Sequence, residues 1–307
     1  MFPSVSFTVN TCMTDVPFLE QTLRHVFRSL DFPFSERLIA YDPGNPMGKY
    51  DSRRRGDSAE ILAIFDRLLA DGLIDRVDTV PWSEEHQADV LMRYFDRDDI
   101  ALKDFDGAPI YQYLYALDRC TGDYIFHMDS DMLFHTTPGI SWLAQAIEML
   151  RREPRVVFAT CRGGPPQARN LLERFLKRPI GGKPPSFWFK AETFSTRYFL
   201  MDRARFQSKL LPILQAKSAE PLENSITHTL KLRGLERWTT TGLESWSIHP
   251  WRHDDNYLTY LDDLIWAVEN GVYPFVRTGY RWDMRTENEH IKEWLDAIAG
   301  AGRINSR

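Results

Sequence analysis

The sequence has few cysteines, no long apolar run and little excess charge, and each of these shortages excludes a class of protein. Its 307 residues contain three isolated cysteines, Cys12, Cys120 and Cys161, with no CxxC spacing. This usage indicates reduced thiols in a core and argues against a disulfide framework or a zinc site. No stretch approaches 18 uninterrupted apolar residues, so we expect no membrane span.

The charge balance argues against further classes of protein. Lys and Arg number 38 against 43 Asp and Glu, for a net charge of -5, which argues against a surface built to bind nucleic acid or anionic lipid. The first basic side chain is Arg24, so the charged start of a secretory signal is absent. We therefore expect a soluble, cytoplasmic protein. The content of 43% hydrophobic and 26% charged residues is typical of a globular chain.

Apolar segments of strand and helix periodicity alternate along the chain. This alternation predicts an α/β fold with a central, mainly parallel sheet covered by helices on both faces. No linker divides the chain, so residues 1–307 are predicted to form one domain. Strands are expected at 5–9, 38–41, 77–82, 124–128, 156–160, 197–201 and 246–248, and helices at 17–30, 57–69, 109–120, 138–152, 203–215 and 222–233.

Two basic segments fall between these elements. A Gly/Pro-rich stretch at about 162–185 encloses only a short helical pattern, Leu171 to Leu176, and is predicted to be a flexible flap. Arg53, Arg54 and Arg55 are either a solvated loop or contacts for pyrophosphate.

Two carboxylates stand at the end of the predicted strand 124–128, as Asp129-Ser130-Asp131. Ligands of open α/β sheets bind at the carboxyl ends of strands. Alternate residues of an extended chain share a face, about 6.6 Å apart, which is close enough to flank one hydrated cation. Carboxylate oxygens favour Mg²⁺ or Mn²⁺. The alternative is a solvated acidic loop.

The order of three segments resembles the GT-A glycosyltransferases of the family 2 type. These segments are 5–11 (VSFTVNT), 17–23 (PFLEQTL) and 122–131 (GDYIFHMDSD), the last resembling the DxD strand of that superfamily. The resemblance covers roughly residues 5 to 135 and extends weakly to 250. It implies a Rossmann-like three-layer α/β/α sandwich, with a nucleotide-sugar-binding half at 1–135 and an acceptor-binding half at 136–307.

The same resemblance implies the ligands of the donor site. Thr8, Asn10 and Asp42 would contact the base and ribose of a UDP or GDP sugar, together with Asp129 and Ser130. Asp129 would also contact the metal, Mn²⁺ or Mg²⁺, and Asp131 would be its principal ligand. Asp42 stands in Tyr41-Asp42-Pro43-Gly44 instead of the usual acid-rich turn, so a turn-forming role stays open for it.

A catalytic base and a further metal ligand are implied by later segments. Glu223-Asn224, at the start of a predicted helix, resembles the Glu-Asp pair of family 2 enzymes, and Glu223 would deprotonate the acceptor during inversion. Asn224 departs from that pair, because an amide cannot accept a proton at neutral pH. Glu220 is a reserve base, and acids opposing the helix dipole are the alternative.

The late histidine of GT-A enzymes would be His249, with His253 behind it, and a nitrogen ligand would shift the preference towards Mn²⁺. A packed histidine with no metal is the alternative. Aromatic faces suit sugar rings, so the acceptor site is expected to use some of four tryptophans, namely Trp188, Trp246, Trp251 and Trp282.

The sequence thus predicts a metal-dependent glycosyltransferase that transfers a sugar, with inversion, from a nucleotide-diphosphate donor to a carbohydrate or other hydroxyl-bearing acceptor. The main rival is a catalytically silent nucleotide-sugar-binding protein of the same fold. A haloacid-dehalogenase-type phosphatase also carries DxD after a strand, but normally near the chain start and followed by Gly-Thr, whereas Met132-Leu133 follow here. A sugar nucleotidylyltransferase needs a Gly-rich first loop, and residues 10–14 have no glycine.

Overall fold

A computed structural model describes residues 3–44, 48, 56–166, 188–275 and 282–303. Within them, eight strands form a central sheet in the order β3-β2-β1-β4-β9-β6-β10-β8. Neighbours β3, β2, β1 and β4 run parallel, as do β6 and β10, whereas β9 and the edge strand β8 run antiparallel to their neighbours. The strands are β1 (Val5–Cys12), β2 (Glu36–Asp42), β3 (Arg76–Thr79), β4 (Tyr124–Asp129), β6 (Val156–Thr160), β8 (Trp188–Ala191), β9 (Tyr198–Asp202) and β10 (Glu236–Thr240).

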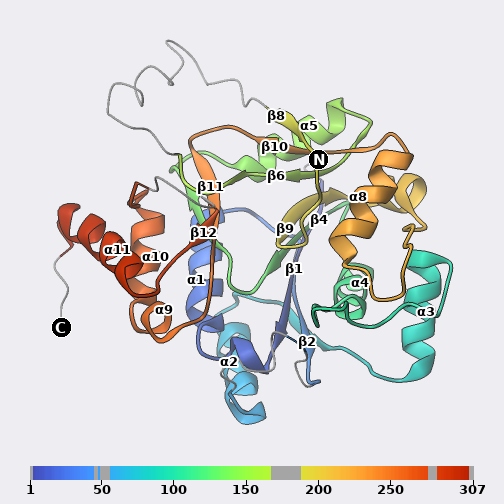
Figure 1. Cartoon of the computed structure of the whole chain (residues 1–307), viewed down its shortest axis with the longest axis horizontal. Coiled ribbons are helices and arrows are strands. Elements are labelled where there is room, and N and C mark those ends of the chain that lie inside the picture. The colour runs from blue at the N-terminus through green and yellow to red at the C-terminus, as the bar shows by residue number, and fades with distance from the viewer. Residues whose placement is uncertain (1–2, 45–47, 49–55, 167–187, 276–281, 304–307) are drawn as a thin grey trace.

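Helices cover both faces of this sheet, as Figure 1 shows. One face packs on α1 (Leu19–Leu30), α2 (Ser58–Ala70) and α5 (Trp142–Arg152). The other packs on α3 (Glu84–Phe95), α4 (Tyr111–Arg119) and α8 (Leu222–Leu232). The fold is therefore the predicted α/β sandwich of three layers with a large, mostly parallel sheet.

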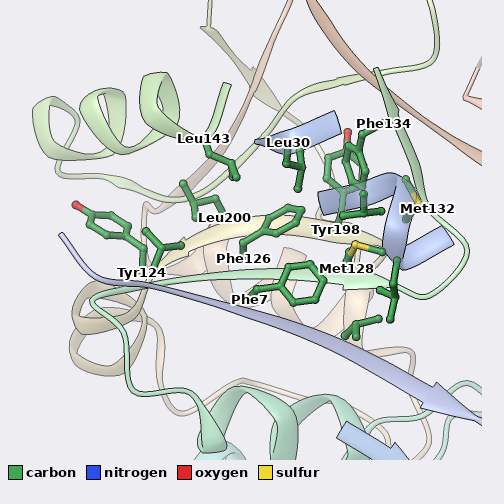
Figure 2. Packing of buried hydrophobic residues seen from close by; sticks show 14 of the residues in the cluster. Phe7, Leu30, Tyr124, Phe126, Met128, Met132, Phe134, Leu143, Tyr198 and Leu200 are labelled. Atoms are coloured by element: carbon green, nitrogen blue, oxygen red, sulfur yellow. The ribbon is translucent and has the colours of Figure 1, made fainter. Parts of the chain in front are cut away.

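The alternation of strand side chains explains the two cores. In β4, Phe126 lies in the cluster under α1 and Ile125 in the cluster under α4, because successive strand residues point to opposite faces. Figure 2 shows Phe126 beside Phe7 of the neighbouring strand, with Leu143 of α5 above them; the two phenyl centroids are 5.9 Å apart.

A smaller sheet extends the molecule beyond the central one. Its strand β11 (Ser245–Pro250) pairs antiparallel with β5 (Leu133–Thr136) and parallel with β12 (Asp283–Met284) and β7 (Arg162–Gly163). A third apolar cluster fixes this sheet to the last helices, α9 (Asp255–Thr259), α10 (Leu261–Glu269) and α11 (Glu289–Gly300). No helix in the described residues is long and apolar enough to cross a membrane.

Most predicted elements are confirmed, with differences at their ends. The helix predicted from residue 57 begins with a capping box: Asp57 accepts from the Glu60 N–H at 2.8 Å, and Glu60 accepts from the Asp57 N–H at 2.9 Å. The predicted helix 138–152 begins only at Trp142, after a turn in which Gly139 has a φ of 80°.

One predicted helix is wrong at its end, over residues 211–215. The segment 203–215 is helical only as α7 (Arg203–Arg205) and the π-helical turn η3 (Phe206–Leu210). Pro212 follows, and a proline disfavours helical geometry in the residue before it. The helical pattern at 171–176, most of the flap at 162–185 and the three arginines at 53–55 lie outside the described residues. The division into donor and acceptor halves stays a prediction.

Candidate functional site

The carboxyl ends of β1, β2 and β4 meet at one edge of the central sheet. Asn10 of β1 lies opposite Ala40 of β2 and Asp129 of β4, and Cys12 lies opposite Asp42. Pairing thus brings together three of the residues predicted to bind the donor. Ligands of open α/β sheets bind at this edge.

Asn10 is buried at this edge without using its polar atoms. Its side chain is 7% exposed, and neither its amide nitrogen nor its amide oxygen has a hydrogen-bond partner in the described part of the chain. Buried polar groups are normally hydrogen-bonded. Thr8, two residues earlier, is fully buried, so it lies deeper in the sheet than Asn10.

Asp129 ends β4 and is held by two other elements. The Tyr113 hydroxyl of α4 donates to Asp129 Oδ1, and the Asp129 N–H donates to the Arg197 carbonyl at 2.6 Å. Burial, and then the charge of Asp131, raise the pKa of the Asp129 carboxyl well above its usual range. Two carboxylates that oppose each other's ionisation form a site that gains from a cation.

Two histidines face one oxygen of Asp131. His253 Nε2 lies 2.9 Å from Asp131 Oδ2, and His249 Nε2 lies 3.4 Å from the same atom. His249 belongs to β11, whereas His253 precedes α9 and packs its ring 4.3 Å from the Phe18 ring. Asp131 itself is 6% exposed. His249 and His253 therefore both contact Asp131, the predicted principal metal ligand.

Asp15 is an acid of this site that was not among the residues predicted from the sequence. It lies in the 3-10 turn η1 (Met13–Asp15) and accepts the Cys12 N–H at 3.0 Å. Burial raises its pKa to about 6, against hydrogen bonds from Cys12 and the Ser130 side chain that lower it. The sequence did contain one indication of this role. Asp15 ends the polar segment 11–15 that follows the first predicted strand, and that segment reaches the same sheet edge as Asp129.

Asp42 closes a turn and holds an aromatic side chain. Its Oδ1 accepts the Gly44 N–H at 2.7 Å and the Trp82 indole N–H at 3.0 Å. A side chain added at Gly44 would lie 2.9 Å from this oxygen, so the turn is tight. The turn-forming role left open for Asp42 is present, while its role towards a nucleoside stays a prediction.

Glu223 lies in the first turn of α8. It is connected to Asp129 through Thr196 and Arg197. Its Oε1 accepts from the Thr196 N–H at 2.7 Å and from the Thr196 hydroxyl at 3.1 Å. The next residue, Arg197, is the one that accepts the Asp129 N–H. The charge of Glu223 also raises the pKa of Asp129, after burial and the charge of Asp131. The reserve acid Glu220 instead accepts the Ala216 N–H within its own loop.

The four tryptophans proposed for an acceptor site have different environments. Trp246 is 1% exposed and packs in the third cluster, and Trp188 packs partly buried against the core. Trp251 and Trp282 are 41% and 45% exposed. They lie beside the pair of His249 and Asp283, since the His249 N–H donates to the Trp282 carbonyl at 3.1 Å.

The side chains around Asp131 are of the types that bind a divalent cation, but they are not arranged in a complete coordination shell. In the described residues, no group of three or more His, Cys, Asp and Glu side chains is arranged to hold a metal ion. Carboxylate oxygens with imidazole nitrogens are nevertheless a donor set that suits Mn²⁺. Asp283, paired with Arg197 at 3.2 Å, lies 3.8 Å from the other nitrogen of His249.

Comparisons with known proteins give only distant structural likenesses. No protein-family model matches the chain, and no curated protein matches it either. GalNAc-T7, crystallised with UDP, GalNAc and Mn²⁺, is similar over 81% of this chain and 44% of its own, with 13% identity and a TM-score of 0.46. TarS from S. aureus is similar over 85% and 39%, with 13% identity and a TM-score of 0.44.

A mycobacterial protein is similar over 87% of this chain and 73% of its own, with 12% identity and a TM-score of 0.41. The chain therefore spans less than half the length of the first two structures.

Proposed function

We propose that this protein is a metal-dependent glycosyltransferase that moves a sugar from a nucleotide-diphosphate donor to a hydroxyl-bearing acceptor. The observation that carries the proposal is the convergence of Asp131 with His249 and His253 at a sheet edge where Asn10 is buried without a side-chain partner among the described residues. Such an edge offers oxygen and nitrogen donors to a cation and an unused amide to a polar ligand.

The chain's own residues would bind and orient the donor. Asp131, Asp129, His249 and His253 would hold Mn²⁺ or Mg²⁺, which stabilises the charge that gathers on the diphosphate leaving group. Asn10 would hydrogen-bond the nucleoside, and Asp42 would meet it at the neighbouring strand end. UDP and GDP sugars are the donors to test.

Glu223 would accept the proton of the acceptor hydroxyl if the reaction inverts the anomeric centre. One of its oxygens already accepts two hydrogen bonds from Thr196, which fixes the orientation of the carboxylate. A general base has to lie within hydrogen-bond reach of the proton it removes, so the acceptor would bind beside the start of α8.

The test is hydrolysis of UDP- and GDP-linked sugars with Mn²⁺, by the protein and by D131N. A unit charge pair at 4 Å is worth about 4 kcal/mol at an effective dielectric constant of 20, or roughly three decades of rate. We expect D131N to fold and to lose at least about a hundredfold in turnover. D296N, at an exposed position of α11, is the matched control and should keep its rate.

The rival functions give different results in the same assay. Binding of UDP with Mn²⁺ but no hydrolysis and no transfer would indicate a silent nucleotide-sugar-binding protein. Release of phosphate from 4-nitrophenyl phosphate, lost in D129N, would indicate a phosphatase instead. Wild-type turnover in D131N would exclude Asp131 as a ligand of a catalytic metal ion.

A further inference from the structure

A pocket of about 520 Å³ opens along α8, from Glu223 in the first turn to Lys231 in the last. We call it the α8 pocket. Phe194 and Thr227 contribute to its lining, and the Phe194 N–H donates to the Thr227 hydroxyl at 2.8 Å. Because Thr196 joins Glu223 to the segment that holds Asp129, the pocket begins next to the proposed donor site.

The polar groups of the α8 pocket are mostly hydrogen-bond donors. Asn224, Thr227, His228 and Lys231 line it together, because residues three and four apart share one face of a helix. The Thr227 hydroxyl accepts one bond and keeps a proton that it can donate. Lys231 offers an ammonium group, and His228 and Asn224 offer further N–H groups.

Charge is distributed unevenly along this pocket. Glu223 is its one carboxylate among the described lining residues and lies at the start of the helix, whereas Lys231 lies in the last turn. Eight residues of helix separate their backbones by about 12 Å, which is longer than one pyranose ring. His228 and Lys231 are both exposed to solvent, so a ligand can reach them.

We propose that the α8 pocket binds the acceptor, and that this acceptor carries an anionic group, a carboxylate or a phosphate, which contacts Lys231 and His228. The inference rests on the proposed function. The acceptor hydroxyl would lie at Glu223 and the anionic group at the other end, where the donors are. The acceptor is accordingly larger than a monosaccharide, as an acidic glycoside is.

The experiment compares acceptors that differ only in charge. Initial rates are measured with Mn²⁺ and the nucleotide sugar that the hydrolysis assay selects. The acceptors are 4-carboxyphenyl and the isosteric neutral 4-carbamoylphenyl glycosides of glucose, galactose and mannose. We expect the carboxylate acceptor to have a KM at least about fivefold lower, with a similar kcat, since a charge-assisted contact to Lys231 forms on binding.

Variants at the far end of the pocket test the contact itself. K231A should raise the KM of the carboxylate acceptor to that of the neutral one and leave the neutral one unchanged, and H228Q should do so in part. K292A is the matched control, because Lys292 is exposed on α11, and both KM values should stay as in wild type. Thermal melts of each variant establish that the fold is retained.

Four outcomes are possible, and each decides the question. The charge preference with its loss in K231A supports the inference. Equal KM values in wild type, or a preference that survives K231A, would overturn it. Hydrolysis of the nucleotide sugar without transfer to either acceptor would overturn it and leave the proposed function standing. If the protein neither binds UDP or GDP nor hydrolyses their sugars, that result counts against the proposed function, and the inference falls with it.

Discussion

At the scale of single residues, the site depends on one carboxylate oxygen that faces two imidazoles. Asp131 Oδ2 is within 3.4 Å of both His249 Nε2 and His253 Nε2. Asp131, His249 and His253 would hold the proposed divalent cation through these atoms. Because His249 comes from β11 and Asp131 from the turn after β4, the candidate site requires both sheets to be in place.

Each histidine can be tested through metal affinity. We expect H253Q and H249Q each to weaken Mn²⁺ binding roughly tenfold or more, since loss of partners outside the coordination sphere already costs 10–100-fold. The measurement is the Mn²⁺ signal in electron paramagnetic resonance titrations. H290Q, on α11, is the control and should bind Mn²⁺ as wild type does. Unchanged affinity in H249Q would remove that residue from the coordination sphere.

Only some residues of the site could be predicted. The position of Asp129 and Asp131 followed from a buried strand that ends in acids, and strand ends gather at one sheet edge. Tyr113 gave no signal, because its contact with Asp129 depends on how α4 packs across the sheet. Asp15 was visible as an acid after the first strand, but nothing in the sequence alone indicated that a turn would bring it to Ser130.

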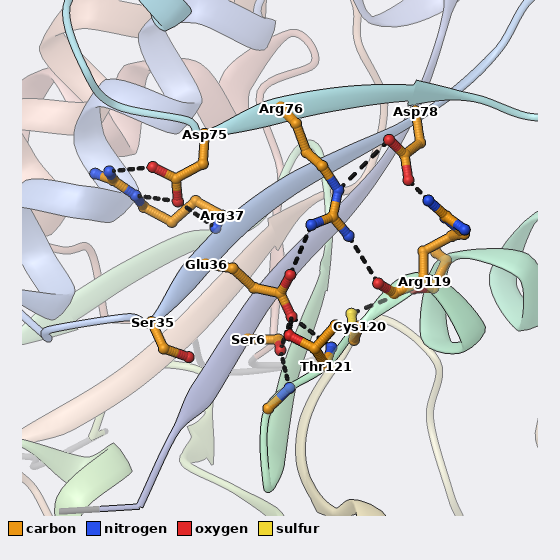
Figure 3. A network of polar contacts seen from close by, with 12 residues as sticks. Ser6, Ser35, Glu36, Arg37, Asp75, Arg76, Asp78, Arg119, Cys120 and Thr121 are labelled. Carbon is orange, nitrogen blue, oxygen red and sulfur yellow. Dashed lines mark hydrogen bonds and ion pairs between the residues drawn. The ribbon is translucent and has the colours of Figure 1, made fainter.

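At the scale of elements, a carboxylate at the start of β2 joins three strands. Glu36 Oε1 accepts from the Ser6 hydroxyl of β1 and from the Thr121 hydroxyl at 2.8 Å, just before β4. Its Oε2 pairs with Arg76 of β3 at 2.8 Å. Figure 3 shows these contacts converging on Glu36. They anchor the ends of the strands opposite the proposed donor site.

This network makes stability depend on pH. Burial alone would raise the pKa of Glu36, but the hydrogen bonds of Ser6, Thr121 and Arg76 outweigh it and lower the pKa from 4.5 to about 2. Because its pKa is depressed, the ionised Glu36 carboxylate stabilises the fold above pH 4.5. This stabilisation is lost as the pH falls towards 2. We expect E36Q to cost about 3 kcal/mol at pH 7.

Urea denaturation of wild type and E36Q from pH 7 to pH 3 measures this contribution. The difference in unfolding free energy should shrink as pH falls below 4.5. E85Q, exposed on α3, controls for the loss of one negative charge. A constant difference across this range would contradict the assignment.

A buried histidine holds α1 against the smaller sheet and α10. His25 Nε2 accepts the Phe134 N–H at 3.0 Å, so its proton lies on Nδ1, which donates to Glu269 at 2.9 Å. Burial lowers the pKa of His25 in spite of Glu269, in keeping with this neutral form. The imidazole therefore satisfies one buried donor of β5 and one acceptor of α10.

Replacing this histidine should weaken the junction. H25L leaves the Phe134 N–H without its acceptor, and a buried unsatisfied donor costs about 1–3 kcal/mol. We expect a loss of about 2 kcal/mol in denaturant unfolding, against less than about 0.5 kcal/mol for H290L, at a partly exposed position of α11. Equal stability of H25L and wild type would show that the contact contributes nothing.

At the scale of the whole molecule, the proposed donor site lies where the two sheets join. Asp129 is the last residue of β4, and Leu133 begins β5 only four residues later. The central sandwich could be predicted, because its strands and helices alternate in sequence. The smaller sheet could not, since it pairs β5 with β11, which lies more than a hundred residues away, and no local pattern encodes that pairing.

The position of the site at this junction predicts a global response to ligand. A ligand that binds only the native state stabilises it by about 2.7 kcal/mol at a hundred times its Kd. We therefore expect UDP or GDP together with Mn²⁺ to raise the melting temperature of wild type by several degrees, and neither Mn²⁺ nor nucleotide alone to do as much.

The most direct test of the metal-linked donor site is calorimetric titration of UDP and GDP into the protein, once with Mn²⁺ and once with EDTA. We expect one of the two nucleotides to bind at least about tenfold more tightly with Mn²⁺, D131N to remove this difference, and D296N to preserve it. Equal binding of both nucleotides with and without Mn²⁺, or a D131N variant that keeps the full metal dependence, would rule out a metal-linked donor site at Asp131.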